Sequence, residues 1–361
     1  GQTDWIIPYW VVIAIMAVLT GFYVIFGGYM ATAINDFIQG IIMLVGIVAV
    51  IAAVLSGQGG FMEAIQQMAK IPSDVPITAG QQGAFTSFFG PDPLNLLGVV
   101  ILTSLGTWGL PQMIHKFYAI KDEKSINTGT VISTVFAVII SGGCYFLGGF
   151  GRLFDHPSLH DEAGNMIYDG IIPYMLSTLP DILIGIVVVL VLSASMSTLS
   201  SLVLTSSSTL TLDFLKGNII KKMSERKQVV TMQILVVFFI VLSVVLAINP
   251  PVFIAQLMGI SWGALAGAFL APFLYGLYWR GVTRASVWAS FACGVGITVS
   301  NMYFKYIASP INAGAIAMIA GLVVVPVVSL ITPKMSKSKT EEIFSCYDEK
   351  VLISKKRSLE G

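Results

Sequence analysis

The sequence predicts an all-α protein whose helices cross a membrane about nine times. Of its 361 residues, 55% are apolar and 11% are charged, and the mean hydropathy is +0.84. A soluble domain would carry about a quarter charged residues, so this composition excludes that class. Crossing the hydrocarbon core of a bilayer takes roughly 20 consecutive apolar residues. Nine such segments can be drawn: Ile6–Phe26, Ile34–Leu55, Leu94–Ile114, Thr130–Phe150, Ile182–Leu212, Val229–Ile248, Val252–Tyr278, Ala285–Phe304 and Asn312–Thr332.

The first two spans are separated by a few residues, among which Gly27 and Gly28 permit a sharp turn without the steric cost of a Cβ atom. Asp36 lies at the start of the second span. Carboxylates near or within a bilayer are costly and tend to face the bundle interior or a water-filled path. The alternative is a helix-start carboxylate that is favoured by the helix dipole and wetted by the interface.

The loop after the second span is rich in Gly, Gln and Pro, and within it Phe61–Lys70 is expected to form a short helix on the outer surface. The third span contains Gly106, Gly109 and Pro111, which weaken or interrupt a helix. Irregular backbone at membrane depth is tolerated only where it lines protein or a cavity. Transporters built on inverted repeats place such helices at the substrate site. The alternative is a proline kink with Trp108 anchored at the interface.

The fifth span differs from the others because twelve of the nineteen residues from Ser193 to Thr211 are Ser or Thr. At helical spacing, small and oxygen-bearing residues form one stripe along it. Such a stripe can coordinate a desolvated cation. Alternatively, the hydroxyls bond to the carbonyl one turn back and let another helix pack closely. The stripe consists of Ala194, Ser197, Thr198, Ser201, Thr205 and Ser208.

The last four spans complete a transmembrane domain over residues 1–333, and residues 334–361 form a polar tail. The tail is expected to be partly disordered, with an amphipathic piece around Ile343–Ile353. The chain begins with Gly and enters its first span without the features of a signal peptide, so we expect an N-terminally truncated product. The three cysteines, Cys144, Cys293 and Cys346, are far apart and imply no disulfide framework.

The basic residues predict the orientation in the membrane, because Lys and Arg are retained on the cytoplasmic side. One alternating set of loops, together with the tail, holds 17 basic residues, and the other set holds only Lys70, Arg152 and Lys305. The N-terminus is therefore expected outside and the tail in the cytoplasm. The outer loop over residues 151–181 is also acidic.

Four segments resemble the sodium/solute symporter family, which includes proline, pantothenate, sialic acid and sugar carriers. Gly27–Gly40 resembles its Gly-Gly…Thr-Asp…Gln element, and Thr107–Lys124 resembles its substrate-site helix and the loop that follows. Ser193–Ser201 is similar to its sodium-binding helix, and Gly276–Arg280 to the Leu-Tyr-Trp-Lys/Arg that ends another helix. These segments occur in the family's order and spacing over essentially the whole chain up to the tail.

The resemblance implies a fold of two five-helix repeats that are inverted with respect to each other. Members similar to the proline carriers have thirteen spans, and the nine predicted here match the last nine. The chain as given would then lack the first four spans. These include the broken first core helix, whose carbonyls supply part of the sodium and substrate sites in the family.

The resemblance also implies sodium as the coupling ion. Ser197 and Thr198 match the family's sodium-binding hydroxyl pair, and Ala194 matches the position that offers its carbonyl. In some members a second sodium lies between groups that match Ser200, Ser201 and Asp36. The predicted topology places these three at one level, because the fifth span runs inward and the second starts at the cytoplasmic face.

The implied function is sodium-driven import of a small polar solute across the plasma membrane, with no nucleic-acid partner and no catalysis. Thr107 stands where sugar carriers place an aromatic ring, which argues against a hexose and favours an amino acid, pantothenate or a short carboxylate. Trp108 and Gln112 are candidate walls of the pocket, with Gln256 and Trp262 from the seventh span. The alternatives are a ligand-sensing membrane domain and a non-functional truncated copy. An intramembrane enzyme is disfavoured because His115, His156 and His160 lie in or beside loops and no His-Glu-x-x-His motif occurs.

Overall fold

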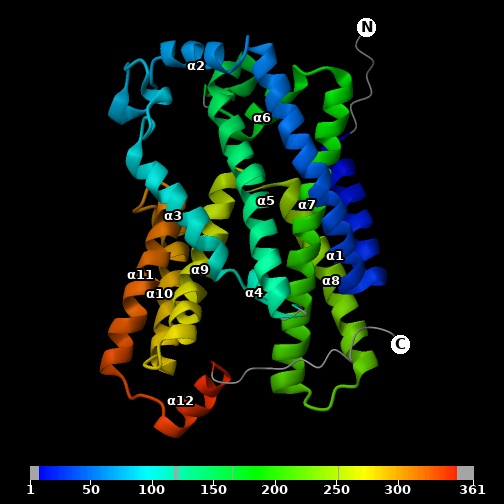
Figure 1. Ribbon diagram of the computed structural model, residues 1–361, viewed down its shortest axis with the longest axis vertical. Helices are drawn as coiled ribbons and strands as arrows, with labels where there is room; N and C mark the ends of the chain where they lie inside the picture. The colour runs from blue at the N-terminus through cyan, green and yellow to red at the C-terminus, as the bar shows by residue number, and fades with distance from the viewer. Residues whose placement is uncertain (1–7, 118–119, 121, 165, 251, 348–361) are drawn as a thin grey trace. The chain divides into compact units, whose positions relative to one another are not determined.

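The computed structural model describes residues 8–117, 120, 122–164, 166–250 and 252–347, which are predominantly helical (Figure 1). These residues contain no β-strand, and one isolated antiparallel bridge joins His160 to Met166. Eight helical segments in the described chain are long and apolar enough to cross a membrane, and a shorter apolar helix, Pro93–Gly109, stands where the third span was expected. The predicted all-α fold is confirmed. The helices divide between two compact units.

The first unit comprises Gly1–Pro91 and Val131–Phe253. Its core forms where α7 packs against α1 and α8 (Figure 1). Val187 of α7 is buried among Ile47, Val50 and Val54 of α1, and Val203 is buried with residues of α1 and α8. The helices of this unit are α1 (Tyr9–Gly57), α2 (Phe61–Lys70), most of α5 (Glu123–Gly149), α6 (Tyr168–Ser177), α7 (Asp181–Ser208) and α8 (Glu225–Ile248), with short 3-10 turns at Pro76–Thr78, Ala84–Thr86, Phe150–Phe154 and Pro157–Leu159.

Helix α1 contains both of the first two predicted spans without a non-helical linker, which corrects our expectation of two separate helices. The chain nevertheless reverses direction within α1. The Tyr23 hydroxyl interacts with the side chain of Asn35, although a straight helix would place residues twelve positions apart about 18 Å from each other. The reversal therefore lies between Tyr23 and Asn35, the interval that contains Gly27 and Gly28.

Two other elements can be compared directly with their predictions. Helix α2 covers Phe61–Lys70, the residues predicted for a short helix in that loop. The fifth predicted span extends further than expected, because α7 continues into a π-helix over Thr209–Ile219. Serine and threonine side chains near this junction bond back to the helix, as Ser207 Oγ does to the carbonyls of Val203 and Leu204. Such bonds compete with the regular backbone pattern.

The second unit comprises Asp92–Thr130 and Ile254–Gly361. In this unit α9 packs against α3, α10 and α11. Its backbone comes close to theirs at small residues, since a Cβ atom on Gly267 would lie 3.1 Å from the Cα of Gly294. Close approach at small residues is the usual basis of helix association in lipid. The helices are α3 (Pro93–Gly109), α4 (Pro111–Phe117), α9 (Ile254–Tyr278), α10 (Arg284–Phe304), α11 (Pro310–Ile331) and α12 (Lys337–Phe344).

The third predicted span is broken, as its Gly and Pro residues indicated. Helix α3 ends at Gly109, Leu110 is extended, and α4 begins at Pro111. Gly109 packs directly against Ala266 of α9, so a side chain there would collide with that helix. The break is therefore a packed feature of the second unit.

The tail differs from its prediction. We expected an amphipathic piece around residues 343–353, but α12 covers Lys337–Phe344 and a 3-10 turn follows at Ser345–Tyr347, while residues 348–353 lie outside the described chain. Two contacts fix this earlier position. The Arg280 guanidinium lies 5.2 Å above the ring of Phe344, and the Tyr347 hydroxyl donates to the Leu277 carbonyl at 2.8 Å.

Candidate functional site

The predicted sodium residues lie on α7, and their hydrogen bonds follow the local pattern that hydroxyls adopt on helices. Thr198 Oγ1 donates to the Ala194 carbonyl at 3.0 Å, and Ser200 Oγ donates to the Ser197 carbonyl at 2.9 Å. Thr198 is exposed and Ser197 is half-buried. Ala194 and Thr198 thus present a carbonyl and a hydroxyl oxygen side by side, one turn apart. Their role as sodium ligands stays a prediction.

The buried face of α7 is not the stripe that we selected from the sequence. Along α7 the buried hydroxyls are those of Ser193, Ser200 and Ser207, seven residues apart, followed by Thr211 in the π-helix. Ser200 and Ser207 are fully buried, whereas Ser201 of the predicted stripe is half-buried. The buried hydroxyl-bearing face therefore passes through Ser200.

Tyr23 of α1 links α7 to the region of Asp36. Its hydroxyl donates to the Met196 carbonyl at 3.0 Å and also interacts with the side chains of Ser200 and Asn35. Asp36 is close enough to Tyr23 to act on it electrostatically. Asp36 and Ser200, two of the three residues proposed for a second sodium, are therefore neighbours of the same hydroxyl. Sequence reasoning missed Tyr23, and a phenolic hydroxyl in an otherwise apolar span was the available signal.

A simple register explains this neighbourhood. Gly46 lies against Leu190, and Ile47, Val50 and Val54 pack with the start of α7, so the second part of α1 runs antiparallel to α7. This register pairs Asp36, ten residues before Gly46, with Ser200, ten residues after Leu190. It likewise pairs Gln39, seven residues before Gly46, with Ser197, seven residues after Leu190.

Gln39 Oε1 in this region is buried without a hydrogen-bond partner among the described residues. Thr20 Oγ1 and Asn35 Nδ2 are buried as well, and both side chains interact with the Tyr23 hydroxyl. Thr20 is fully buried and Gln39 is 6% exposed. Buried polar atoms are rarely left unsatisfied in native proteins, and an ion or ordered water is one usual explanation. Hydroxyl, amide and carboxylate oxygens are the ligands that hard cations prefer.

The candidate substrate residues all lie in the second unit. Trp262 packs on Gly106, since a Cβ atom there would lie 3.0 Å from the Trp262 ring, and it borders the core of Leu102 and Met318. Trp108 is 59% exposed. The structure thus brings Trp262 to the broken helix, but it makes Trp262 part of a packed helix interface. Thr107, Gln112 and Gln256 are half-buried, and Thr107 Oγ1 bonds back to the Ser104 carbonyl at 3.2 Å.

Among the described residues no group of three or more His, Cys, Asp or Glu side chains could hold a metal ion. Cys144, Cys293 and Cys346 are free thiols. The buried hydroxyl, amide and carboxylate groups around Tyr23 form the candidate ion site of the first unit.

Comparisons with known proteins show the family to which the chain belongs. The model of the sodium:solute symporter family matches residues 3–294. The chain is 28% identical to the sodium/pantothenate symporter of Haemophilus influenzae over 324 residues, which are 87% of this chain and 64% of that protein. It is 28% identical to a sodium/proline symporter of Staphylococcus aureus over 334 residues, which are 90% of this chain and 62% of that protein. It thus spans less than two thirds of the length of these relatives.

A solved structure shares the fold. It is a Na+-coupled sialic acid symporter in a substrate-bound, outward-open state that reveals a novel Na+ site, and it aligns with a TM-score of 0.63 at 16% identity, over 92% of this chain and 69% of that one.

Proposed function

Because the chain belongs to the sodium:solute symporter family, we propose that it acts in sodium-coupled import of a small polar organic solute. The observation that supports this most is the buried polar region around Tyr23, Asp36 and Ser200. Oxygen ligands of this kind bind a monovalent cation, and neutral dipoles bind it weakly enough for release. Sodium moving down a membrane potential supplies about 2.3 kcal/mol per charge per 100 mV.

The first sodium is held by the hydroxyls of Ser197 and Thr198 and the Ala194 carbonyl. Their positions one turn apart on α7 support this assignment, because the carbonyl and the Thr198 hydroxyl lie 3.0 Å apart. A bound sodium ion would be coordinated by the Ala194 carbonyl oxygen and the Thr198 hydroxyl oxygen, and the hydrogen bond between these two groups would weaken. Because Thr198 is exposed within the described chain, an ion can reach this side of α7.

A second sodium is held by Asp36, Ser200 and Ser201. The hydrogen bond of Tyr23 with Ser200 and its electrostatic interaction with Asp36 support this proposal. Tyr23 is a positioning residue, because its donation to the Met196 carbonyl holds α1 against α7. The register of α1 and α7 pairs Gln39 with Ser197, so its amide oxygen is at the level of the first ion.

The solute is an amino acid, pantothenate or a short carboxylate, and it is bound by the broken helix. Thr107, Trp108 and Gln112 lie around the break between α3 and α4, and Gln256 and Trp262 lie on α9, which packs against α3. The packing of Trp262 on Gly106 supports a role as a wall of this region. The protein lies in the cell membrane with its N-terminus outside and its tail in the cytoplasm.

We assign the chain no catalytic role. A ligand-sensing membrane domain is the second candidate, and no observation in the structure favours it over transport. Reconstituted full-length protein separates the two. Transport predicts that a labelled solute from a panel of amino acids, pantothenate and short carboxylates accumulates in vesicles only with an inward sodium gradient. A sensor predicts saturable solute binding without accumulation.

A further inference from the structure

The first unit contains a cavity of about 670 Å³ that none of the proposed transport residues lines. It lies where α1 ends, where the Phe150–Phe154 turn ends and where α6 leads into α7. Its lining combines polar and apolar groups, and among the apolar ones Val54, Phe154 and Leu179 are buried while Leu183 is half-buried. Asp155 contributes a carboxylate and Tyr174 an aromatic ring. Cavities of this size and mixed lining are typical of small-molecule sites.

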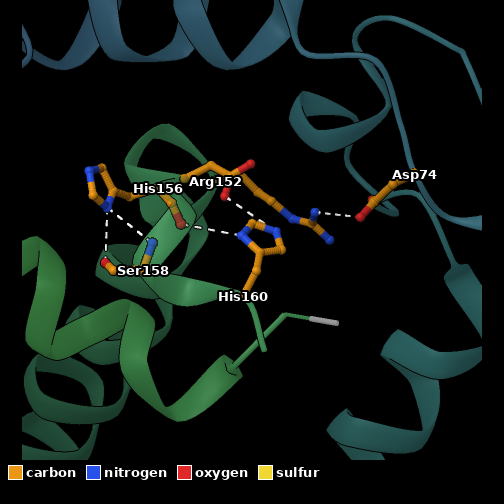
Figure 2. A network of polar contacts seen from close by, with 6 residues as sticks. Asp74, Arg152, His156, Ser158 and His160 are labelled. Carbon is orange, nitrogen blue, oxygen red and sulfur yellow. Dashed lines mark hydrogen bonds and ion pairs between the residues drawn. The ribbon is translucent and has the colours of Figure 1, made fainter. Parts of the chain in front are cut away.

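The surroundings of the cavity are acidic. Residues 151–181 contain five acidic side chains and one basic side chain, Arg152. Arg152 is already engaged, because its guanidinium lies 2.7 Å from Asp74 (Figure 2). It also lies 4.8 Å from the centre of the Phe85 ring. The hydrogen bond from Arg152 holds the pKa of Asp74 below its usual value. Arg152 is thus paired with Asp74, and among the described residues Asp155 has His160, at 3.7 Å, as its partner.

The helix ends at the cavity add to this polarity. Residues Ser56, Gly57 and Gln58 place the C-terminal end of α1 on the lining, and a helix C-terminus carries partial negative charge. The N-terminal end of α7, whose dipole would favour an anion, carries Asp181 in its first turn, which offsets that dipole. We therefore expect these groups to favour a cation over an anion in the cavity.

Two histidines flank the charged and aromatic groups. His160 Nδ1 donates to the His156 carbonyl at 3.2 Å (Figure 2), and its Nε2 lies 3.7 Å from Asp155 Oδ1. His156 Nδ1 accepts the backbone N–H of Ser158 at 3.2 Å, and its ring stacks on Tyr174 with centroids 4.9 Å apart. One face of Tyr174 is covered in this way, and the residue still lines the cavity.

We propose that this cavity binds a small organic ammonium ion, with Asp155 as its counter-ion and the apolar walls and Tyr174 around its carbon atoms. The Asp155 side chain is 62% exposed, so the carboxylate stands at the mouth and the apolar walls lie deeper. An alkylammonium group suits both parts, because it carries a charge that is less strongly hydrated than that of an inorganic ion and it interacts favourably with aromatic faces. The site is separate from the proposed sodium and solute residues, and the inference goes beyond the proposed function.

The test uses tetramethylammonium as the probe and tert-butanol as its neutral counterpart of similar size. Binding is measured by ligand-observed NMR on the purified full-length protein in a sodium-free potassium buffer, so the result does not depend on sodium-coupled transport. Saturable binding of tetramethylammonium is expected, with at least tenfold weaker binding in Asp155→Asn. Glu162→Gln, which removes an exposed acidic side chain of the same loop outside the lining, should bind as the wild type does.

A second variant tests the cavity itself. Leu183→Trp fills the space without removing the carboxylate, and it should abolish saturable binding while size-exclusion profile and circular dichroism stay unchanged. The proposal is overturned if tetramethylammonium shows no saturable binding, if tert-butanol binds equally well, if folded Asp155→Asn binds normally, or if folded Leu183→Trp binds normally. Sodium-driven uptake is measured separately, so loss of one activity does not report on the other.

Discussion

Replacing Asp36 by Asn tests whether a second sodium is bound beside Tyr23. The carboxylate neighbours the same hydroxyl as the fully buried Ser200, and in the proposed site it is the one anionic ligand. Interactions that involve a charged partner contribute about 1.5–3 kcal/mol each, which corresponds to about a 10- to 150-fold change in affinity for that ion. The variant should therefore lower the Hill coefficient for sodium from near two toward one.

The assay is solute uptake into proteoliposomes at varied sodium concentration, together with the charge moved per solute. Glu225→Gln is the matched control, because Glu225 is an exposed acidic residue in the first turn of α8. It should leave both quantities unchanged. Equal Hill coefficients and equal charge per solute in wild type and Asp36→Asn would refute the two-ion reasoning. Asp36 would then be a half-buried residue inside α1 that does not ligate a coupled ion, because the structure places it within the helix and not at a helix start.

Three further predictions concern packing, pH and topology. Gly294→Ala should destabilise the protein by roughly 1–3 kcal/mol, because the added methyl group would overlap the backbone of α9. Gly296→Ala is the control and should not destabilise it, because its methyl group would meet open space. The thermal midpoint in detergent measures both effects. The pKa of Asp74 is lowered by Arg152, so their pair stabilises the fold above the ordinary carboxyl range and is lost as pH falls through the lowered value. In the wild type the free energy of unfolding should therefore decrease at acid pH by at most about 1 kcal/mol, because the pair is exposed. Arg152→Gln should abolish this decrease, which is measured as the thermal midpoint against pH. An unchanged profile would contradict the assignment. In a cysteine-free background, engineered cysteines in the acidic loop between α5 and α7 should be labelled from outside, and those between the π-helix and α8 should not; the reverse pattern would contradict the charge-based orientation.

Local chemistry predicted much of the fold. Glycine and proline act through the backbone of the helix that contains them, so the break at Gly109 and Pro111 was visible without knowledge of the neighbours. The bounds of α2 were visible for the same reason, since loop residues flank a short amphipathic segment. Apolar length alone indicated the spans.

Features that depend on tertiary contacts were not visible. Helix α7 is apolar around much of its surface and has hydroxyls on more than one face, so the sequence did not distinguish the stripe through Ser197 from the buried face through Ser200. Tyr23 gained its role only because α1 reverses and brings Asn35 and Asp36 back beside it. The cavity at Asp155 requires α1, the Phe150–Phe154 turn and the α6–α7 junction to meet, which no local pattern encodes.

The most direct test of the central claim is sodium dependence of uptake in the Ser197→Ala/Thr198→Ala double variant of the full-length protein. The account predicts that the wild type accumulates solute in proteoliposomes only with an inward sodium gradient. It also predicts that the double variant needs at least about tenfold more sodium for half-maximal uptake, because two oxygen ligands are lost and each such interaction contributes about 1 kcal/mol or more. Accumulation without a sodium gradient, or the same half-maximal sodium concentration in both proteins, would contradict it.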